Sequence, residues 1–353
     1  MRIIPISPED PRWTDFISSQ PQALIYHHPL WTGVIKKAYG HRNATLAAEA
    51  PDAKIVGVLP LMRTWGISTG VRFASLPHTP VAGPLAASPE IAAELISAAI
   101  QLVASMPGAA LQLKTMSVLP AAAASLKTVG WEATFMLQLP ARGEKIRFGD
   151  SRHHQRVLWS VRHGERLGCK VVEAESVVEL RQWYQLYLHT MQPKVVPPRP
   201  LRFFLVAWDL LRPAGLMRLL LARDESNEII AGALFFVFGE TVFYAFNARR
   251  ENQLSLRPND LLQWRAIHDA QAAGHRFYDF GEVEADDEGL ADFKRKWGAR
   301  PHQLWRHYYP AQREPETNRL LQNDAIQRLL SATWRSLPVK ATGVLGGWIY
   351  SYL

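Results

Sequence analysis

The residues best suited to chemistry gather in the stretch from Tyr278 to Gly298. An apolar, aromatic run ends there at Gly281, and five carboxylates follow within seven residues, at positions 282, 284, 286, 287 and 288. Three kinds of site would use this pattern: a kinase-like metal site, a calcium loop, or a loop that places one lysine in a substrate cleft. A basic and aromatic group closes the stretch: Phe293, Lys294, Arg295, Lys296 and Trp297.

The two metal sites are excluded by the surrounding sequence. A kinase needs an HRD-type catalytic loop and a glycine-rich nucleotide loop besides Asp279-Phe280-Gly281, and the chain has neither. A calcium loop needs alternating D-x-D-x-D-G spacing, which 282–288 lacks. Because the histidines are scattered along the chain, no metal triad is legible and we expect no metal. Serine hydrolase chemistry lacks its G-x-S-x-G context at Ser75 and Ser255.

Asp279 and Lys294 each keep two interpretations. Asp279 ends an apolar strand, and carboxylates at such strand ends often belong to the site of an α/β sheet. A carboxylate in this position can equally cap the following turn. Lys294, from its spacing alone, is an exposed lysine of a short helix.

The composition is that of a large globular protein with excess positive charge. With 353 residues, 48% of them hydrophobic and 20% charged, the chain is natural for two domains and is neither disordered nor fibrous. Its net charge is +8, and a cationic stripe suits phosphate-rich partners such as RNA, nucleotide-linked substrates or anionic lipid headgroups. The alternative is a solvated helix face. The stripe consists of Lys145, Arg147, Arg152, Arg156, Arg162, Arg166 and Lys170.

The single cysteine and the two chain ends bear on location. Cys169 alone allows neither an intramolecular disulfide nor a cysteine-based metal cluster, so a reducing, cytosolic compartment fits best. The N-terminal residues lack the apolar core of a signal peptide, and no apolar run reaches the roughly 20 residues that span a bilayer. The apolar, aromatic tail 334–353 either touches a membrane surface or packs on the second domain.

Periodicity and turn residues predict a mixed α/β order in the first half. Glycine and proline punctuate 66–89, which we expect to be a long surface loop, and composition shifts at 141–150. The expected helices are 23–40, 90–106 and 120–130, and the expected strands are 44–51, 54–65, 110–116 and 131–140.

The second half repeats this order. Ser176 lies three residues before Glu179 in a capping-box pattern, and Asn259 or its neighbour is expected to cap a later helix. The predicted fold class is α/β (α+β), with two mixed sheets flanked by helices in domains 1–145 and 146–315, followed by a helical tail at 316–353. The expected helices are 151–168, 176–192, 201–213, 259–274, 290–298 and 316–335, and the expected strands are 169–174, 216–224, 229–238, 241–247, 277–281 and 304–310.

Several segments in this order resemble the FemAB-like branch of the GNAT acyltransferase superfamily. More narrowly, the chain is similar to proteins with a FemAB or BioF2-like acetyltransferase domain that are found near exopolysaccharide gene clusters. The basic helix 151–168 resembles the segment that opens the family's second domain. The other matching segments are YHHPLW (26–31), IVGVLPL (55–61), RPNDLLQWRAIHDAQAAGHRFYDFG (257–281) and DFKRKWG (292–298).

The resemblance implies two tandem GNAT-like domains that transfer an acyl or aminoacyl group to an amine of a peptidoglycan or exopolysaccharide precursor. Lys294 lies in the match to the family's FKxxWG signature, whose lysine faces the transfer site, and Asp279 is its expected catalytic partner. A lysine can stabilise the oxyanion and a carboxylate can accept the proton. The expected substrate-binding residues, whose aromatic members are core residues in the alternative interpretation, are His28, Trp31, Arg257, Asn259, Phe293 and Trp297.

Two departures from the family bear on the donor. No uninterrupted heptad run corresponds to the helical hairpin of some tRNA-using members. The segment 248–262 contains no glycine, whereas ordinary GNAT enzymes hold the CoA pyrophosphate with a glycine-rich turn. In place of that turn, the side chains of Arg249, Arg250 and Arg257 could bind phosphate. The residues that we predict to bind phosphate are Arg152, Arg156 and Arg249.

These expectations define the co-substrates and partners. The donor is acyl-CoA or aminoacyl-tRNA, used as a co-substrate rather than as a tightly bound cofactor. The acceptor is a small-molecule or lipid-linked envelope precursor, and DNA is not an expected partner. The expected location is the cytoplasm, with peripheral contact at the inner face of the membrane. The alternatives are an acyl-CoA-dependent N-acetyltransferase acting on an amino sugar and a non-catalytic module that binds anionic lipid-linked intermediates.

Overall fold

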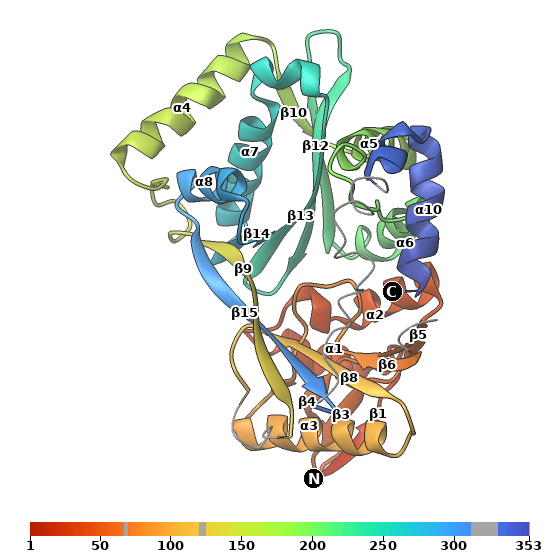
Figure 1. Ribbon diagram of the computed structural model, residues 1–353. Helices are drawn as coiled ribbons and strands as arrows, with labels where there is room; N and C mark the ends of the chain where they lie inside the picture. Colours follow the sequence, from red (N-terminus) through yellow and green to blue (C-terminus); the bar gives the residue numbers. More distant parts are fainter. Residues whose placement is uncertain (67–69, 120–124, 312–330, 353) are drawn as a thin grey trace. The chain divides into compact units, whose positions relative to one another are not determined.

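The computed structural model describes residues 1–66, 70–119, 125–311 and 331–352, and it divides into two compact units (Figure 1). The border lies inside two long strands, β9 (Lys127–Gln138) and β15 (Arg300–Tyr309), where no change in sequence pattern marks it. The domain ranges expected from the sequence, 1–145, 146–315 and 316–353, differ from these two units and remain a prediction of which parts of the chain form domains. Unit 1 comprises Met1–Glu132, Gln303–Arg328 and Ile349–Leu353, and unit 2 comprises Ala133–His302 and Leu329–Trp348.

Unit 1 combines short strands with helices around one apolar core. One sheet has the strand order β1-β3-β4-β7. A second sheet contains the strands β15-β8-β6-β5-β2, in that order. Helix α3 packs its Leu95, Ile96 and Val103 against strand residues such as Leu59 and Leu111. The elements are β1 (Arg2–Pro5), α1 (Pro11–Ser18), η1 (Ile25–His27), α2 (Pro29–Tyr39), β2 (Arg42–Asn43), β3 (Leu46–Glu49), β4 (Ile55–Leu59), β5 (Met62–Gly66), β6 (Gly70–Ala74), β7 (Leu85–Ala86), α3 (Pro89–Ala104) and β8 (Ala110–Thr115).

Three expectations for unit 1 need correction. The predicted helix 23–40 is interrupted at His28, because Pro29 favours the first position of a new helix, α2, for which His28 is the N-cap. The surface loop expected at 66–89 was wrong for its described residues: they include β6 and β7, and Phe73, Val81 and Leu85 are buried. In the predicted helix 120–130, residues 120–124 lie outside the described part, and strand β9 begins at Lys127.

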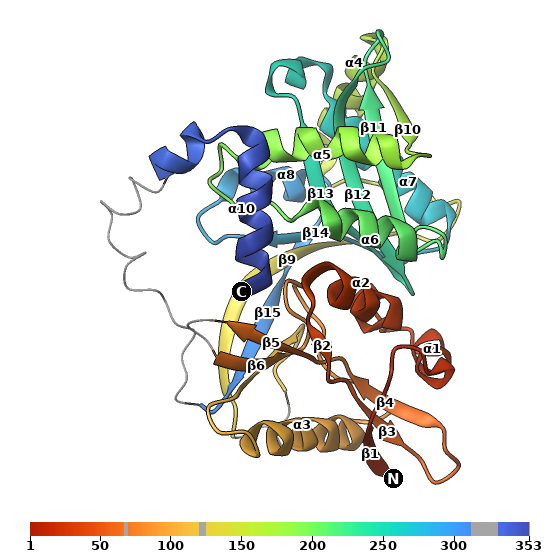
Figure 2. The same ribbon diagram turned by 90° about the vertical axis from the view of Figure 1, so that its right-hand side faces the viewer.

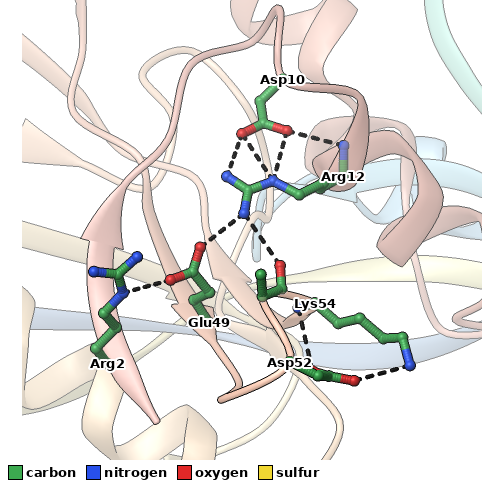
Figure 3. A network of polar contacts seen from close by, with 7 residues as sticks. Arg2, Asp10, Arg12, Glu49, Asp52 and Lys54 are labelled. Atoms are coloured by element: carbon green, nitrogen blue, oxygen red, sulfur yellow. Dashed lines mark hydrogen bonds and ion pairs between the residues drawn. The ribbon is translucent and has the colours of Figure 1, made fainter.

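An ion-pair network joins the N-terminal strand and helix α1 of unit 1 (Figure 3). The Arg12 guanidinium donates to the Asp10 carboxylate at 2.7 Å and to the Glu49 carboxylate at 2.7 Å. Arg2 donates to the other oxygen of Glu49. Each of these cations therefore has a carboxylate partner.

Unit 2 is built on six strands in the order β10-β11-β12-β13-β14-β9. Helices α5 and α6 cover one face of this sheet and α7 covers the other (Figures 1 and 2). Neighbouring strands are antiparallel except for β13 and β14, which are parallel. The remaining elements are α4 (Ser151–Arg166), β10 (Lys170–Glu173), α5 (Val177–Met191), α6 (Leu201–Leu211), β11 (Met217–Arg223), β12 (Ile229–Phe238), β13 (Thr241–Arg249), η3 (Glu251–Leu256), α7 (Pro258–Ala272), β14 (Phe277–Val283), α8 (Glu288–Lys296) and α10 (Val339–Tyr352).

The helix ends of unit 2 test the capping predictions. The Ser176–Glu179 capping box at the start of α5 is confirmed. The prediction of Asn259 as a cap was wrong, because α7 begins at Pro258 with Arg257 as its N-cap and with no side-chain cap. Most of the predicted helix 316–335 lies outside the described residues, but the chain is helical from residue 331 to 336. Within the described residues, no helix has both the length and the apolar character that crossing a membrane requires.

Candidate active site in the second unit

The two parallel strands of unit 2 stop pairing before they end. Thr241–Phe243 of β13 pair with Phe277–Asp279 of β14, and no pairing follows toward their carboxyl ends. On its other side, β14 shifts register against β9 between Asp279 and Glu282. Ligands of α/β sheets bind at the carboxyl ends of parallel strands where neighbouring strands separate, so this end of the β13–β14 pair is the candidate site.

Asp279 and Lys294 hold the irregular segment of β14 by binding the N–H and the carbonyl of one residue, Gly281. Gly281 has φ of 82°, a left-handed conformation that favours glycine. Its N–H donates to Oδ1 of Asp279 at 2.7 Å, and its carbonyl accepts from Nζ of Lys294 at 2.9 Å. Lys294 Nζ also donates to the Glu282 carbonyl at 2.9 Å. The sequence-predicted pair thus comes together around Gly281.

Burial changes the protonation of both groups. Lys294 is 2% exposed, and this burial lowers its pKa to about 8, although Asp279, Glu282 and Asp287 act in the opposite direction. Burial likewise raises the pKa of Asp279, against the opposing effects of the Thr134 hydroxyl, the Gly281 N–H and the Lys294 cation. Shifted groups at a strand end are typical of functional sites. Since two of its three N–H groups already bind carbonyls, Lys294 positions the main chain of β14.

The start of α7 lies next to the end of β13. Asn247 of β13 donates from Nδ2 to Oδ1 of Asn259 at 3.1 Å, which explains why the Asn259 side chain does not cap its own helix. Tyr244 of β13 is partly buried near Asn247 and Gln263, and this burial raises the pKa of its phenol. The Gln263 Oε1 accepts from the Tyr278 hydroxyl at 2.6 Å. Sequence reasoning missed Tyr244 and Gln263, because only the fold brings them together.

The second half of the FKxxWG-like segment supports structure rather than a binding surface. Lys296 forms a buried ion pair with Asp260, which is 36 residues away in sequence, and its Nζ lies 4.9 Å from the ring centre of Phe293. Trp297 is fully buried and packs edge-on against Phe148 with ring centres 5.1 Å apart. Trp297 therefore lies in the core of this structure, and its substrate contact stays a prediction.

The predicted phosphate-binding arginines lie in two places. Arg152 and Arg156 are exposed on α4, whereas Arg249 at the end of β13 pairs with Glu251 at 3.0 Å. Arg257 lies over the ring of Trp159 at 5.5 Å, and Trp159, which is half exposed, stacks on His163. Trp159 borders a shallow surface hollow of about 710 Å³ on α4, which Arg162 and Arg166 also line. Trp159 was not among the predicted site residues, although an exposed tryptophan within a cationic helix is a visible signal.

The two candidates from the N-terminal motif belong to unit 1. His28 caps α2 by accepting from the Leu30 N–H at 3.1 Å, and burial lowers its pKa to about 4. Trp31 is 2% exposed and meets Tyr26 edge-on with ring centres 5.0 Å apart. Both therefore serve the local structure at the start of α2, and their substrate roles stay predictions. The part of the chain that the structure describes holds no cluster of three or more histidine, cysteine or acidic residues fit for a metal.

Comparison with known proteins matches this architecture to one class. A family model described as an acetyltransferase (GNAT) domain matches residues 151–295, from α4 through α8. The chain has no match among curated protein sequences. The region from α4 through α8 is therefore similar to a GNAT acetyltransferase domain, which supports the predicted acyltransferase class.

Solved structures narrow the fold within that class. FemX superposes with a TM-score of 0.67 at 15% identity, covering 87% of this chain and 97% of FemX. A C-terminal domain (DUF2156) of a provisionally named lysylphosphatidylglycerol synthetase from Agrobacterium fabrum superposes with a TM-score of 0.59 at 13% identity. The match covers 92% of this chain and 95% of that domain. A tandem GNAT protein from the clavulanic acid biosynthesis pathway superposes with a TM-score of 0.51 at 12% identity. The match covers 89% of this chain and 99% of that protein. The chain therefore shares its fold with FemX and with a tandem GNAT protein, as the resemblance to the FemAB-like branch predicted.

Proposed function

We propose that unit 2 transfers an acyl or aminoacyl group to an amine of a cell-envelope precursor of peptidoglycan or exopolysaccharide type. The observation that carries this proposal is the arrangement around Gly281, where Asp279 and Lys294 hold an irregular strand segment inside the matched acetyltransferase region. The printed name of one similar structure, lysylphosphatidylglycerol synthetase, supports aminoacyl transfer to a membrane component as the general reaction class.

The residues present can assist amide formation without covalent catalysis. The acyl carbonyl would lie at the carboxyl ends of β13 and β14, where the Lys294 ammonium adds positive charge as the oxyanion develops. Asp279 and Lys294 keep the Gly281 peptide fixed, which lowers the cost of orienting the substrates. The incoming amine loses its proton to solvent or to a carboxylate as the carbon–nitrogen bond forms and the donor's thiol or tRNA hydroxyl leaves.

The donor would place its phosphates near the start of α7. The first turn of this helix has no side-chain cap, and anions bind favourably at helix N-termini. Arg257, the N-cap residue, adds a guanidinium next to the exposed Trp159. These groups suit both acyl-CoA and the acceptor end of aminoacyl-tRNA, so we propose one of the two as donor.

The decisive experiment is mass spectrometry of the products formed with each donor. The purified protein would be incubated with acetyl-CoA, longer acyl-CoAs or charged tRNA, together with amino sugars and peptidoglycan stem peptides. We expect one donor to give an acceptor heavier by one acyl or aminoacyl group. Ligand binding that falls steeply with salt, without product from any donor, would support the non-catalytic module instead.

We also propose peripheral membrane contact through α10. The inner face of this helix consists of small residues: added side-chain carbons at Gly343 and Gly346 would meet Tyr184 and Pro198. Its outer face is apolar, and Trp348 is 70% exposed. Residues 331–353 contain no carboxylate but include Arg335 and Lys340, a combination typical of helices that lie on anionic membranes.

Sedimentation with anionic vesicles tests this contact. The triple variant Val344→Ser, Leu345→Ser and Trp348→Ser should lose most of its vesicle binding. The variant Val178→Ser, which changes an exposed valine on α5, is the matched control and should bind like the wild type. Equal binding by both variants would contradict the contact.

A further inference from the structure

Unit 1 contains a pocket that the transfer reaction does not use. It lies where the short strand β2 pairs with β5, has a volume of about 410 Å³, and is lined by Tyr39, His41, Arg42, Arg63 and Trp65 among others. All of these residues belong to unit 1. None of them is among the sequence-predicted site residues.

Two arginines lie side by side in the lining of this pocket. Arg42 and Arg63 are direct partners in the antiparallel pairing of β2 with β5, so their side chains leave the same face of the sheet. Both are exposed, and in the part of the chain that the structure describes neither forms an ion pair with a carboxylate. Like charges directly opposite on neighbouring strands destabilise a sheet. An anion between the two guanidinium groups would remove that repulsion.

His41 offers a buried polar group to the same pocket. It is 6% exposed, and its Nε2 has no hydrogen-bond partner among the described residues. Burial lowers its pKa to about 4, so the ring is neutral at physiological pH and keeps one donor and one acceptor nitrogen. Tyr39 stacks against it with ring centres 5.8 Å apart. A buried nitrogen without a partner calls for a ligand that fills its hydrogen-bonding capacity.

Trp65 supplies an apolar surface beside the two cations. It lies two residues after Arg63 in β5, hence on the same face of the strand, and it is 58% exposed. Lys36 and Lys37, both exposed at the end of α2, add positive charge just before the pocket residues in sequence. The pocket lining thus combines two cations, Arg42 and Arg63, with an exposed aromatic ring.

We propose that this pocket is a binding site for a phosphate or pyrophosphate group. Arg42 and Arg63 hold the anion from two sides, because guanidinium groups bind phosphate oxygens in bidentate fashion. His41 completes the contacts from the buried side. Trp65 lies against the part of the ligand next to the phosphate, which is the base of a nucleotide or the chain of a lipid phosphate. The proposal needs neither a donor nor turnover, so its failure would leave the proposed function untouched.

Equilibrium binding of defined anions to the whole protein tests the site. Calorimetric titrations would use inorganic pyrophosphate, adenosine diphosphate and a short-chain lipid phosphate below its micelle concentration, with succinate as the carboxylate comparison. We expect saturable binding of pyrophosphate, weaker binding of succinate, and affinity about tenfold lower in both Arg42→Gln and Arg63→Gln. The tighter-binding ligand of adenosine diphosphate and the lipid phosphate shows whether the site suits a nucleotide or a lipid. Trp65→Ala should weaken binding of that ligand and leave pyrophosphate binding nearly unchanged.

A matched variant controls for the general loss of charge. Arg300→Gln removes an exposed arginine of unit 2 and should bind pyrophosphate like the wild type. Without ligand, Arg42→Gln and Arg63→Gln should unfold at the wild-type temperature or higher, because each relieves the repulsion between the pair. Absence of saturable pyrophosphate binding in the wild type, or equal affinity in all three arginine variants, would overturn the proposal.

Discussion

Charged groups are accommodated in opposite ways around Arg12 in unit 1 and around Lys294 in unit 2. Arg12 lies between two carboxylates, Asp10 and Glu49, and its own side chain remains partly exposed (Figure 3). Lys294 is almost completely buried, and its ammonium donates to two main-chain carbonyls rather than to a carboxylate. The first arrangement ties a strand to a helix, whereas the second fixes the path of a strand that has left its regular pairing.

The difference in burial between Arg12 and Lys294 indicates which of the two charged groups belongs to a functional site. Partly exposed ion pairs contribute little to stability, because solvent already stabilises the separate charges. A buried lysine held by carbonyls costs desolvation free energy, and its lowered pKa records that cost. Such a cost is typical of functional sites, because burying an apolar residue there would be more stable. The comparison therefore separates a structural network from a site that we expect to matter for transfer.

The largest effect should follow from Lys294→Met. This variant keeps the length of the side chain but removes its charge and both hydrogen bonds to Gly281 and Glu282, so we expect transfer to fall about a hundredfold or more. The measurement is the steady-state rate with the donor found active, separating kcat from KM. Arg295→Gln, which alters an exposed neighbour on α8, serves as control and should retain wild-type activity. Full activity in the folded Lys294→Met protein would remove the lysine from the mechanism.

The next effect is on the pH dependence of stability. The folded-state pKa of Lys294 is about 8, below the 10.5 of an ordinary lysine, so between these values the unfolded chain binds more protons than the folded one. The free energy of unfolding should therefore rise with pH across this window, by up to about 3 kcal/mol from this group, with no contribution to the slope below pH 8. Urea unfolding from pH 7 to 10.5 would measure it as wild type minus Lys294→Met. A flat difference would show that Lys294 has an ordinary pKa.

Much of this architecture could be predicted from the sequence, because strong periodicity and end signals fix local structure. The strand at 229–238 was predicted with its observed ends, and the helices at 90–106 and 201–213 to within two residues. The surface loop expected at 66–89 failed because glycine and proline there interrupt strands that tertiary pairing still completes. Likewise, the pattern of residue types along the sequence does not show that the strands β9 and β15 each contribute residues to both units.

The candidate site was predictable only in part. Asp279 and Lys294 could be singled out, since one ends a strand and the other lies in a recognisable segment. Their joint hold on Gly281 was not readable, because it depends on a register shift in β14. Trp297 showed the limit most clearly: a tryptophan beside cations resembles a binding residue in sequence, but in the fold it fills the core against Phe148. The Lys296–Asp260 pair likewise depends on contacts across 36 residues of chain.

A smaller shift should come from Asp279→Asn. The Asp279 carboxylate favours the charged form of Lys294, so its loss should lower the lysine pKa further below 8. If transfer requires the ammonium form, the decline in rate at high pH should then begin at a lower pH than in the wild type. The measurement is kcat/KM against pH for both proteins. A decline that stays at the same pH would mean that Lys294 does not govern it.

The smallest effect should follow from Arg12→Gln, at the other end of the comparison. Arg2 remains bound to Glu49 in this variant, and although Asp10 loses its ion-pair partner, both Arg12 and Asp10 are partly open to solvent, so little stability depends on the pair. We expect the unfolding midpoint to fall by only about 2 °C at low salt, and by less at high salt, where screening already weakens the pair. Transfer activity should not change, because the network lies in unit 1 and contacts none of the groups around Gly281. A loss of activity comparable to that of Lys294→Met, in a protein that remains folded, would show that the two arrangements of charge do not divide into structural and functional ones.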